Sequence, residues 1–441
     1  MDLLKHRRPP LWITTALLLA FALVAGASDE PAGVTATTDG DAEQAASLHE
    51  APGFGGPSAV GHQLQADDKK KESPSLFKGL TKSMQPYYDF KDRLKKKHGL
   101  ALGADYNMLY QTVSESSGED HAASGIIRLF GTWTLLGRKS GNTGSLVAKI
   151  ENRHLLGTGI PPQALASEVG YAGLTAIIWS DAGSLLTNLY WHQSFNEDRV
   201  SFIAGIVDAT DYLDIYGLIN PWTNFANLSF STDPTIPAPN QGLGAALRVN
   251  VADHYYVLAG LADTNGDPGD TSGSFDTFFD DREYFKHIEF GRVGSRETEF
   301  TDNFHIFAWQ ADERIAAQVP KGWGATISFS QKFGEHWLPF ARAGYSDGGG
   351  GVFLERSLSA GIGYFLSARS DLLAFGAAWG RPSEVTYGPG LNDQYTLEMF
   401  YRLQIFQHWT VNGDLQLLID PALDPTVSQV WVFGLSARIN F

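Results

Sequence analysis

The feature that most constrains the fold is an alternation of apolar and polar side chains near the C-terminus. In the last segment, Phe433 and Leu435 fall on one face and Ser436 falls on the other, and segments near 393–406 and 408–419 repeat this pattern. A period of two is typical of a β-strand whose faces meet different environments. The segments are about 11–13 residues long. That is close to the length a tilted strand needs to cross a bilayer, whereas globular strands average about 5–6 residues.

Aromatic residues indicate which face meets lipid. A soluble β-sandwich also alternates, with its apolar face inward. Here the apolar faces begin or end with Tyr395, Trp409, Trp431 and Phe441, and aromatic girdles around an outward apolar band are typical of transmembrane barrels. We therefore predict an all-β fold, a transmembrane antiparallel barrel with its polar face toward the lumen. A soluble all-β sugar-binding protein is the alternative, which membrane fractionation would distinguish.

The same alternation predicts sixteen strands between residues 101 and 441. They lie near 101–112, 124–136, 143–154, 184–195, 199–208, 242–251, 254–263, 284–293, 302–312, 322–332, 336–346, 355–366, 370–380, 393–406, 408–419 and 429–441. Even-to-odd connections are short, such as 196–198, and odd-to-even connections are mostly long, such as 155–183 and 209–241. Outer-membrane barrels have short periplasmic turns, long external loops and an even strand number. The loop lengths therefore predict an outer-membrane β-barrel pore over residues 101–441.

The N-terminus resembles a targeting segment that is cleaved from the mature protein. A positive start precedes an apolar run over residues 11–24 and a small-residue site, Ala25-Gly26-Ala27. This pattern predicts a secretory signal peptide over residues 1–27. Together with the barrel, it places the mature chain in the bacterial cell outer membrane.

Two further segments precede the predicted barrel. Residues 28–75 are rich in Ala, Gly, Asp, Glu and Pro without apolar periodicity, so we predict a disordered linker. Residues 76–100 mix apolar and basic residues around Pro86. We interpret them as a periplasmic leader, either a short basic helix or a solvated segment, and a role as a plug or contact segment is open.

Composition narrows the function classes. The chain has no cysteine, which excludes disulfides and thiolate metal sites. Its formal net charge of −16 argues against a nucleic-acid partner. Asp263, Asp267 and Asp270 resemble part of a calcium loop but lack its later glutamate. We expect no metal, no cofactor and no catalytic residues, so an outer-membrane barrel enzyme is the weakest alternative.

The polar face of the predicted strands carries charges of both signs, in which cations outnumber carboxylates. As pore-lining or substrate residues we select Arg128, Glu151, Arg153, Asn188, Asp208, Trp222, Arg248, Arg342, Glu398 and Arg402. Opposed charges create a transverse field across a constriction, and sugar hydroxyls both donate and accept hydrogen bonds. Wall ion pairs with no solute role are the alternative for each charged residue, and wall packing is the alternative for the ring of Trp222. Glu151 and Arg153 are the strongest candidates, because they lie two apart just before the long connection 155–183.

Several strings of this sequence resemble one known family. They are Ser180-Asp181, Thr187-Asn-Leu-Tyr-Trp191, Phe202-Ile-Ala-Gly-Ile-Val-Asp208, Asp211-Tyr-Leu-Asp214, Asn220-Pro221 and Asp233-Pro-Thr-Ile-Pro-Ala-Pro-Asn-Gln-Gly-Leu-Gly244. These strings resemble the carbohydrate-selective porin family of OprB type. The resemblance implies a sixteen-stranded barrel that passes sugars, often monosaccharides such as glucose, through a constriction of arginines, acids and aromatics. The terminal Phe441 resembles the signal recognised by the barrel assembly machinery.

Two channel functions remain open at this point. The first is passive diffusion of carbohydrate solutes, and the second is a general or anion-leaning diffusion pore, suggested by the excess of Arg and Lys on the polar face. Outer-membrane lipid is the expected surrounding partner. A large apolar face serves lipid and subunit contact equally well, so both a monomer and a homotrimer are compatible with the sequence.

Overall fold

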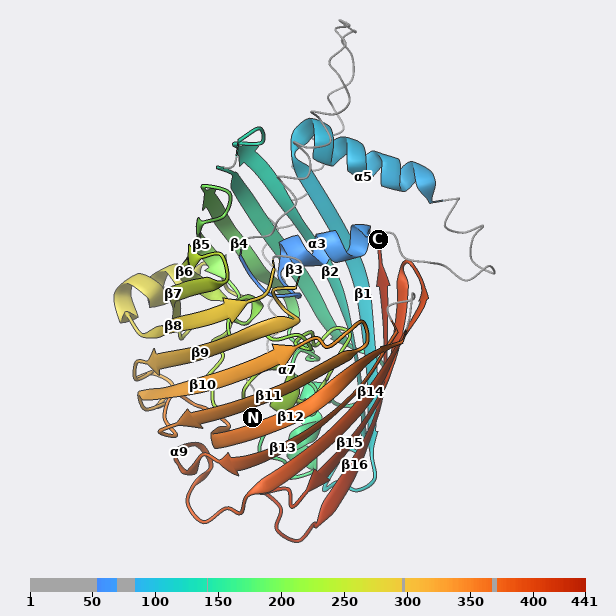
Figure 1. Ribbon diagram of the computed structural model, residues 1–441. Coiled ribbons are helices and arrows are strands. Elements are labelled where there is room, and N and C mark those ends of the chain that lie inside the picture. The colour runs from blue at the N-terminus through green and yellow to red at the C-terminus, as the bar shows by residue number, and fades with distance from the viewer. Residues whose placement is uncertain (1–53, 70–83, 141, 296–297, 367–370) are drawn as a thin grey trace, which may run out of the picture. The chain divides into compact units, whose positions relative to one another are not determined.

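A closed antiparallel barrel dominates the structure. The computed structural model describes residues 54–69, 84–140, 142–295, 298–366 and 371–441. Within them the strands are β1 (Leu100–Val113), β2 (His121–Leu136), β3 (Gly144–Leu155), β4 (Gly183–Phe195), β5 (Val200–Val207), β6 (Gly242–Ala252), β7 (Tyr255–Asp263), β8 (Tyr284–Val293), β9 (Asp302–Ala311), β10 (Gly322–Gln331), β11 (Trp337–Ser346), β12 (Leu354–Leu366), β13 (Asp371–Pro382), β14 (Gln394–Phe406), β15 (Trp409–Ile419) and β16 (Gln429–Asn440). Each strand pairs with its sequence neighbours, and β1 closes the ring against β16 (Figure 1).

The predicted strand pattern is confirmed throughout this region. All sixteen predicted strands have a counterpart, and most bounds agree within one or two residues. The ring closes in register, with Asp105 opposite Asn440 and Leu109 opposite Ser436. Closure leaves the sheet without free edges, so the backbone polar groups of neighbouring strands satisfy one another.

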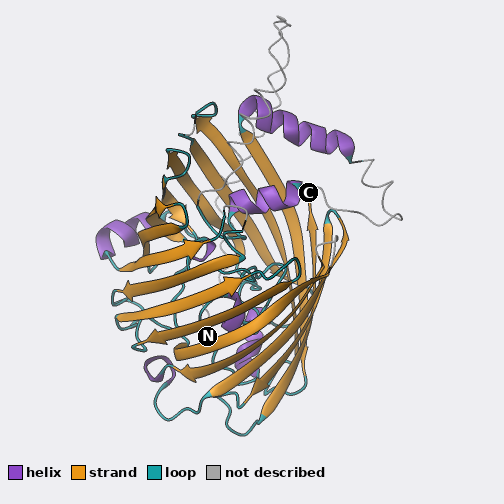
Figure 2. Cartoon of the chain, in the orientation of Figure 1, coloured by secondary structure: helices purple, strands orange, loops and turns teal. Residues whose placement is uncertain are grey.

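The two faces of the strands are oriented as the aromatics indicated. On β14, Tyr395 and Met399 are exposed on the outside, whereas Thr396 and Glu398 are buried inside. The same contrast appears on β16, where Leu435 is 58% exposed. The outer surface of the barrel therefore carries the apolar, aromatic-bordered face. Figure 2 shows the strands that form this wall.

The two ends of the barrel differ in their connections. We call the end where β1 begins and β16 finishes the turn end, and the opposite end, which carries loops 156–182 and 208–241, the loop end. The loops contain the helices η2 (Pro162–Ala164), α6 (Leu165–Glu168), η3 (Ala209–Asp211), α7 (Leu228–Ser231), α8 (Gly273–Asp276), η4 (Thr277–Asp281) and α9 (Glu384–Tyr387). No helix among the described residues is long and apolar enough to cross a membrane.

Loop 208–241 folds into the barrel rather than away from it. Phe225 is fully buried, and its ring centroid lies 4.8 Å from that of Phe400 and 5.9 Å from that of Phe340, on strands β14 and β11. Much of the space between the polar strand faces is therefore occupied by this loop. Loop side chains fill that space, since packed interior surface is more stable than a void.

Two helices precede the barrel among the described residues. Residues 54–69 fall in the predicted disordered linker, yet they include helix α3 (Val60–Asp68), which has buried residues. The rest of that linker and the predicted signal peptide lie outside the described residues. Residues 76–100, for which the sequence left a short helix and a solvated segment open, include helix α5 (Gln85–His98). Proline is tolerated in its first turn, and Gly99, with φ 71°, ends it in the left-handed conformation.

A charge on the outer face should reveal its environment. We predict that Leu435→Arg, near the middle of β16, lowers the free energy of unfolding in lipid vesicles by about 2–4 kcal/mol, because the guanidinium would face hydrocarbon. Leu423→Arg, which changes an exposed leucine of the loop between β15 and β16, is the control and should cost little. Urea titration followed by tryptophan fluorescence measures both. Equal costs for the two variants would contradict an outward lipid face.

Candidate functional site

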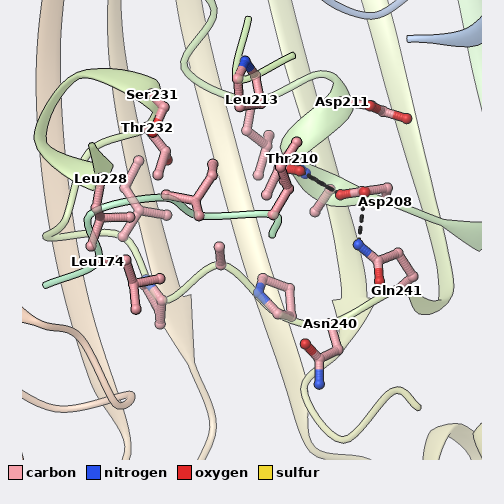
Figure 3. A pocket seen from close by; sticks show the side chains of 18 of the residues that line it. Leu174, Asp208, Thr210, Asp211, Leu213, Leu228, Ser231, Thr232, Asn240 and Gln241 are labelled. Carbon is pink, nitrogen blue, oxygen red and sulfur yellow. Dashed lines mark hydrogen bonds between the residues drawn. The ribbon is translucent and has the colours of Figure 1, made fainter. Parts of the chain in front are cut away.

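A cavity of about 390 Å³ lies between the barrel wall and the inward loops. Its walls come from β3, from loops 156–182 and 208–241, and from loop-end residues such as Arg314 and Gly350. Figure 3 shows Asp208, Asp211 and Gln241 around this space. Loop 208–241 supplies most of the lining, so the fold of this loop determines the shape of the cavity.

Strand β3 supplies a row of charged side chains to the cavity. Lys149, Glu151 and Arg153 are two residues apart, so the pleat directs all three inward. The Arg153 guanidinium donates to one Glu151 carboxylate oxygen over 2.7 and 2.9 Å. The Lys149 ammonium lies 3.1 Å from the carboxylate of Asp211 in helix η3, and the Asn188 amide donates to the same oxygen over 3.2 Å.

Asp208 fastens the two ends of loop 208–241 together. Its carboxylate accepts a hydrogen bond from the Thr210 backbone N–H over 3.0 Å and another from the Gln241 side-chain amide over 2.7 Å (Figure 3). A side-chain acceptor that binds the backbone two residues ahead favours a turn. The loop therefore reverses direction directly after β5, and Asn240 and Gln241 are placed beside the cavity.

Asp214 joins the loop to the opposite wall. Its carboxylate binds the Arg342 guanidinium and lies 2.8 Å from His305 Nε2 and 3.1 Å from the Thr326 hydroxyl. Burial raises the pKa of Asp214, but Arg342 and His305 outweigh it, so the net pKa is lowered. Asp214 has φ 51°, a left-handed conformation that Asp adopts more readily than most residues.

The other two loop carboxyls respond differently to burial. Burial raises the pKa of Asp211 to about 6, even though Lys149 and Asn188 stabilise its ionised form. Burial also raises the pKa of Asp233, which Arg342 lowers only in part. Asp211 therefore titrates closer to neutral pH than an ordinary aspartate does.

An aromatic ring of the same loop completes the cavity wall. The Arg128 guanidinium carbon lies 3.5 Å from the centroid of the Trp222 ring. The ring of Trp179, from loop 156–182, packs edge-on against the Trp222 ring, with 6.2 Å between the two centroids. The Arg128 guanidinium in turn binds the buried carboxylate of Asp105. Cation–π contact of this kind holds a ring in one orientation.

The structure brings only some of the predicted site residues to the cavity. Four line it, namely Glu151, Arg153, Asp208 and Trp222. Arg128 lies behind Trp222 and Asn188 lies beside Asp211, so each contacts a lining residue. Whether any of them binds solute stays a prediction.

The remaining four predicted residues face the interior but do not line this cavity. Glu398 accepts the backbone N–H groups of Ala226 and Asn227 over 2.6 and 3.2 Å, and Arg402 donates to the Asn224 side chain over 2.7 Å. These two strand side chains hold the far part of the loop.

Arg342 and Arg248 contact other interior groups. Arg342 binds Asp214, as described above. Arg248 lies 4.4 Å from the Tyr256 ring and 3.5 Å from Glu299. These contacts fit the wall-pairing alternative left open by the sequence.

Sequence reasoning did not select many of the residues that line the cavity. Among them are Lys149, Asp211, Asn240 and Gln241. Lys149 lies on the same face of β3 as Glu151 and Arg153. The other three lie in the strings that carried the family resemblance, but these strings did not show which residues of the loop face the cavity.

Among the described residues, no three His, Cys, Asp or Glu side chains come together as a metal site. Asp263 instead accepts hydrogen bonds from the Asn265 backbone over 2.9 Å and from the Thr277 hydroxyl. The acidic residues of this loop thus have ordinary turn-forming contacts.

A closed sixteen-stranded barrel with an apolar exterior and an interior narrowed by folded-in loops defines a membrane channel of the porin class. The profile described as carbohydrate-selective porin, OprB family, matches residues 178–441. The chain belongs to this family. The resemblance predicted from the strings between residues 180 and 244 is thereby confirmed.

One solved structure agrees with the fold, and two further matches are less similar to it. A high-pH structure of Pseudomonas putida OprB is 13% identical to this chain. The match covers 80% of this chain and 97% of the OprB chain, with a TM-score of 0.64. A low-pH structure of the same protein is 11% identical, and the match covers 85% of this chain and 100% of the OprB chain, with a TM-score of 0.47. A mutant of the Rh. blastica porin is 12% identical, and the match covers 78% of this chain and 100% of the porin chain, with a TM-score of 0.48. No curated protein sequence matches the chain significantly.

The raised pKa of Asp211 predicts a pH-dependent cavity charge. Between pH 7 and pH 5 its carboxyl takes up a proton, because its pKa is about 6, and the cavity loses one negative charge. We predict that cation preference, measured as the reversal potential under a salt gradient, falls over this range.

Two variants identify the titrating group. Asp211→Asn should abolish the step near pH 6. Asp312→Asn should retain it, because burial raises the pKa of Asp312 but hydrogen bonds from Lys286, Gln310 and the Tyr284 backbone together outweigh burial, so the net pKa is lowered. A step that persists in Asp211→Asn would contradict this assignment.

Proposed function

We propose that this chain is an outer-membrane channel through which carbohydrates, in particular monosaccharides such as glucose, diffuse passively. Family membership supports the carbohydrate class of solute. The cavity between β3 and loop 208–241 is the place where we expect the sugar to bind during passage.

The combination of groups around the cavity carries this proposal. Charged and amide side chains, such as Glu151, Arg153 and Gln241, face the same space as the Trp222 ring. Hydroxyls of a sugar donate to carboxylates and accept from guanidinium and amide groups, while the apolar face of a sugar ring packs on an aromatic ring. A volume of about 390 Å³ is within the range of small-molecule sites, about 300–1,000 Å³.

The charge of the cavity argues against the anion-leaning alternative. Five carboxylates line it (Glu151, Asp208, Asp211, Asp214 and Asp312), against three cations (Lys149, Arg153 and Arg314). The excess of arginine on the strand faces, which suggested that alternative, is largely used in buried pairs such as Arg342–Asp214 and Arg128–Asp105. A near-balanced polar cavity suits neutral, hydroxyl-rich solutes better than small anions.

Passage through such a site requires weak binding. The solute exchanges its water hydrogen bonds for those of the cavity, which lowers the entry barrier, and a modest affinity lets it leave. The direction then follows the concentration gradient. We propose no catalytic step, since a channel of this family and fold needs none.

The surroundings of the channel complete the proposal. We propose that the signal peptide over residues 1–27 directs secretion, that Phe441 engages the barrel assembly machinery, and that outer-membrane lipid covers the exposed apolar face. Both a monomer and a homotrimer are compatible with that face.

Sugar block of ion current tests the proposal. In planar bilayers, glucose at millimolar levels should reduce single-channel conductance by occupying the cavity. Trp222→Ala should weaken the apparent glucose affinity by about three- to tenfold, equivalent to about 0.7–1.4 kcal/mol, because the stacking surface is lost. Trp323→Ala, which removes an exposed tryptophan of the outer face, is the matched control and should retain block.

Two outcomes would count against the proposal. An open channel that no tested sugar blocks is a general diffusion pore. Glucose block of equal strength in Trp222→Ala would move the binding site away from this cavity.

A further inference from the structure

A short segment before the barrel occupies its interior. We call residues 54–69, which include helix α3, the luminal segment. Five of the nine helix residues are buried although the helix is mostly polar. Val60 and Leu64 belong to the same apolar cluster as Phe130 and Val147, whose side chains point inward from β2 and β3. Burial of a polar helix requires polar partners inside the barrel.

The luminal segment extends across the bore. The Asp67 carboxylate binds Arg438 on β16 over 2.7 Å. The His62 ring lies 3.5 Å from Glu299, in the connection between β8 and β9. In a closed ring of sixteen strands, β16 and β8 lie on opposite sides. One short helix thus contacts both walls near the turn end. Figure 1 shows α3 beside the strands near this end.

The wall around Arg438 is electrically incomplete without this segment. Arg438 and Arg128 both bind the single carboxylate of Asp105. Asp67 supplies the second carboxylate, and all four side chains are at most 5% exposed. A buried charge that lacks a partner is strongly destabilising. The docked segment therefore belongs to the stable state of the barrel.

The luminal segment also contacts the loop that forms the cavity. The Gly56 backbone N–H donates to the Asp211 carbonyl over 2.6 Å. The Phe54 ring packs edge-on against Tyr212 at 5.3 Å. Ser58 itself lines the cavity, whereas the lining residues of β3 lie from its middle toward the loop end. The segment thus forms the boundary of the cavity on the turn-end side.

From this geometry we propose that the luminal segment is a plug, a second constriction that solute passes only when the segment is displaced. It closes the route between the cavity and the turn end, and its release opens that route. The inference rests on the proposed channel function but concerns ion and solute passage in general, so sugar preference does not enter its test.

A reversible cross-link tests displacement. A Cβ built on Gly56 would lie 3.0 Å from Cγ1 of Ile215, so the sulfur of a cysteine at position 215 can reach the sulfur of one at position 56. The chain has no cysteine of its own. We predict that the full chain carrying Gly56→Cys and Ile215→Cys conducts at least fivefold less when oxidised than after dithiothreitol. Ile215→Cys alone, which forms no intramolecular bond, should not respond.

A second variant tests the plug without a cross-link. Residues 54–69 are replaced by a Gly/Ser segment of equal length, and barrel folding is checked by heat-modifiable migration on gels. Conductance and maltose permeation should rise severalfold. The proposal is overturned if the folded replacement conducts like the unaltered chain, or if oxidation leaves the double variant unchanged. A rise in conductance without glucose block would instead refute the sugar channel and keep the plug.

Discussion

The pairing of β1 with β16 is the constraint on which the rest of the structure depends. It satisfies the backbone hydrogen bonds around the ring, and a strand sheet in hydrocarbon is stable only when no edge remains. Closure also separates two solvents. The outer face is mostly apolar and exposed, and inward-facing charged groups of the strands, such as Arg128 and Arg342, have their partners inside.

Inside the barrel, charged side chains of the strands pair with groups from the loops and from the N-terminal part. Arg342 binds Asp214 and Glu398 binds the backbone N–H groups of Ala226 and Asn227, so the wall holds loop 208–241 across the bore. Asp105 and Asp67 balance Arg128 and Arg438. The cavity is the space that these contacts leave, and its polar lining follows from the same charges that stabilise the fold.

The strands could be predicted from the sequence because their signal is local. The alternation from Trp409 to Ile419 needs only the pleat of one strand to be interpreted, and the structure confirms it. Helix α3 could not be predicted in this way. Its sequence has no apolar periodicity, and its burial depends on Arg438, which is far away in the chain.

The candidate site was predictable in part for the same reason. Strand parity correctly directed Glu151 and Arg153 inward, and they reach the cavity. The inward and outward alternation along a strand does not show that loop 208–241 covers Glu398 and Arg402, because this depends on the path of the loop. It also could not select Asp211 or Asn240, whose positions depend on the turn that Asp208 stabilises.

The central claim is that the apolar face meets lipid while the cavity behind it is wet and binds sugar. Spin labels at Leu435 and Asn240 in lipid vesicles test it most directly. The account predicts that oxygen relaxes the label at Leu435, that an aqueous nickel complex relaxes the label at Asn240, and that glucose protects only the second. A label at Leu435 that is reached by nickel and shielded from oxygen would contradict the account.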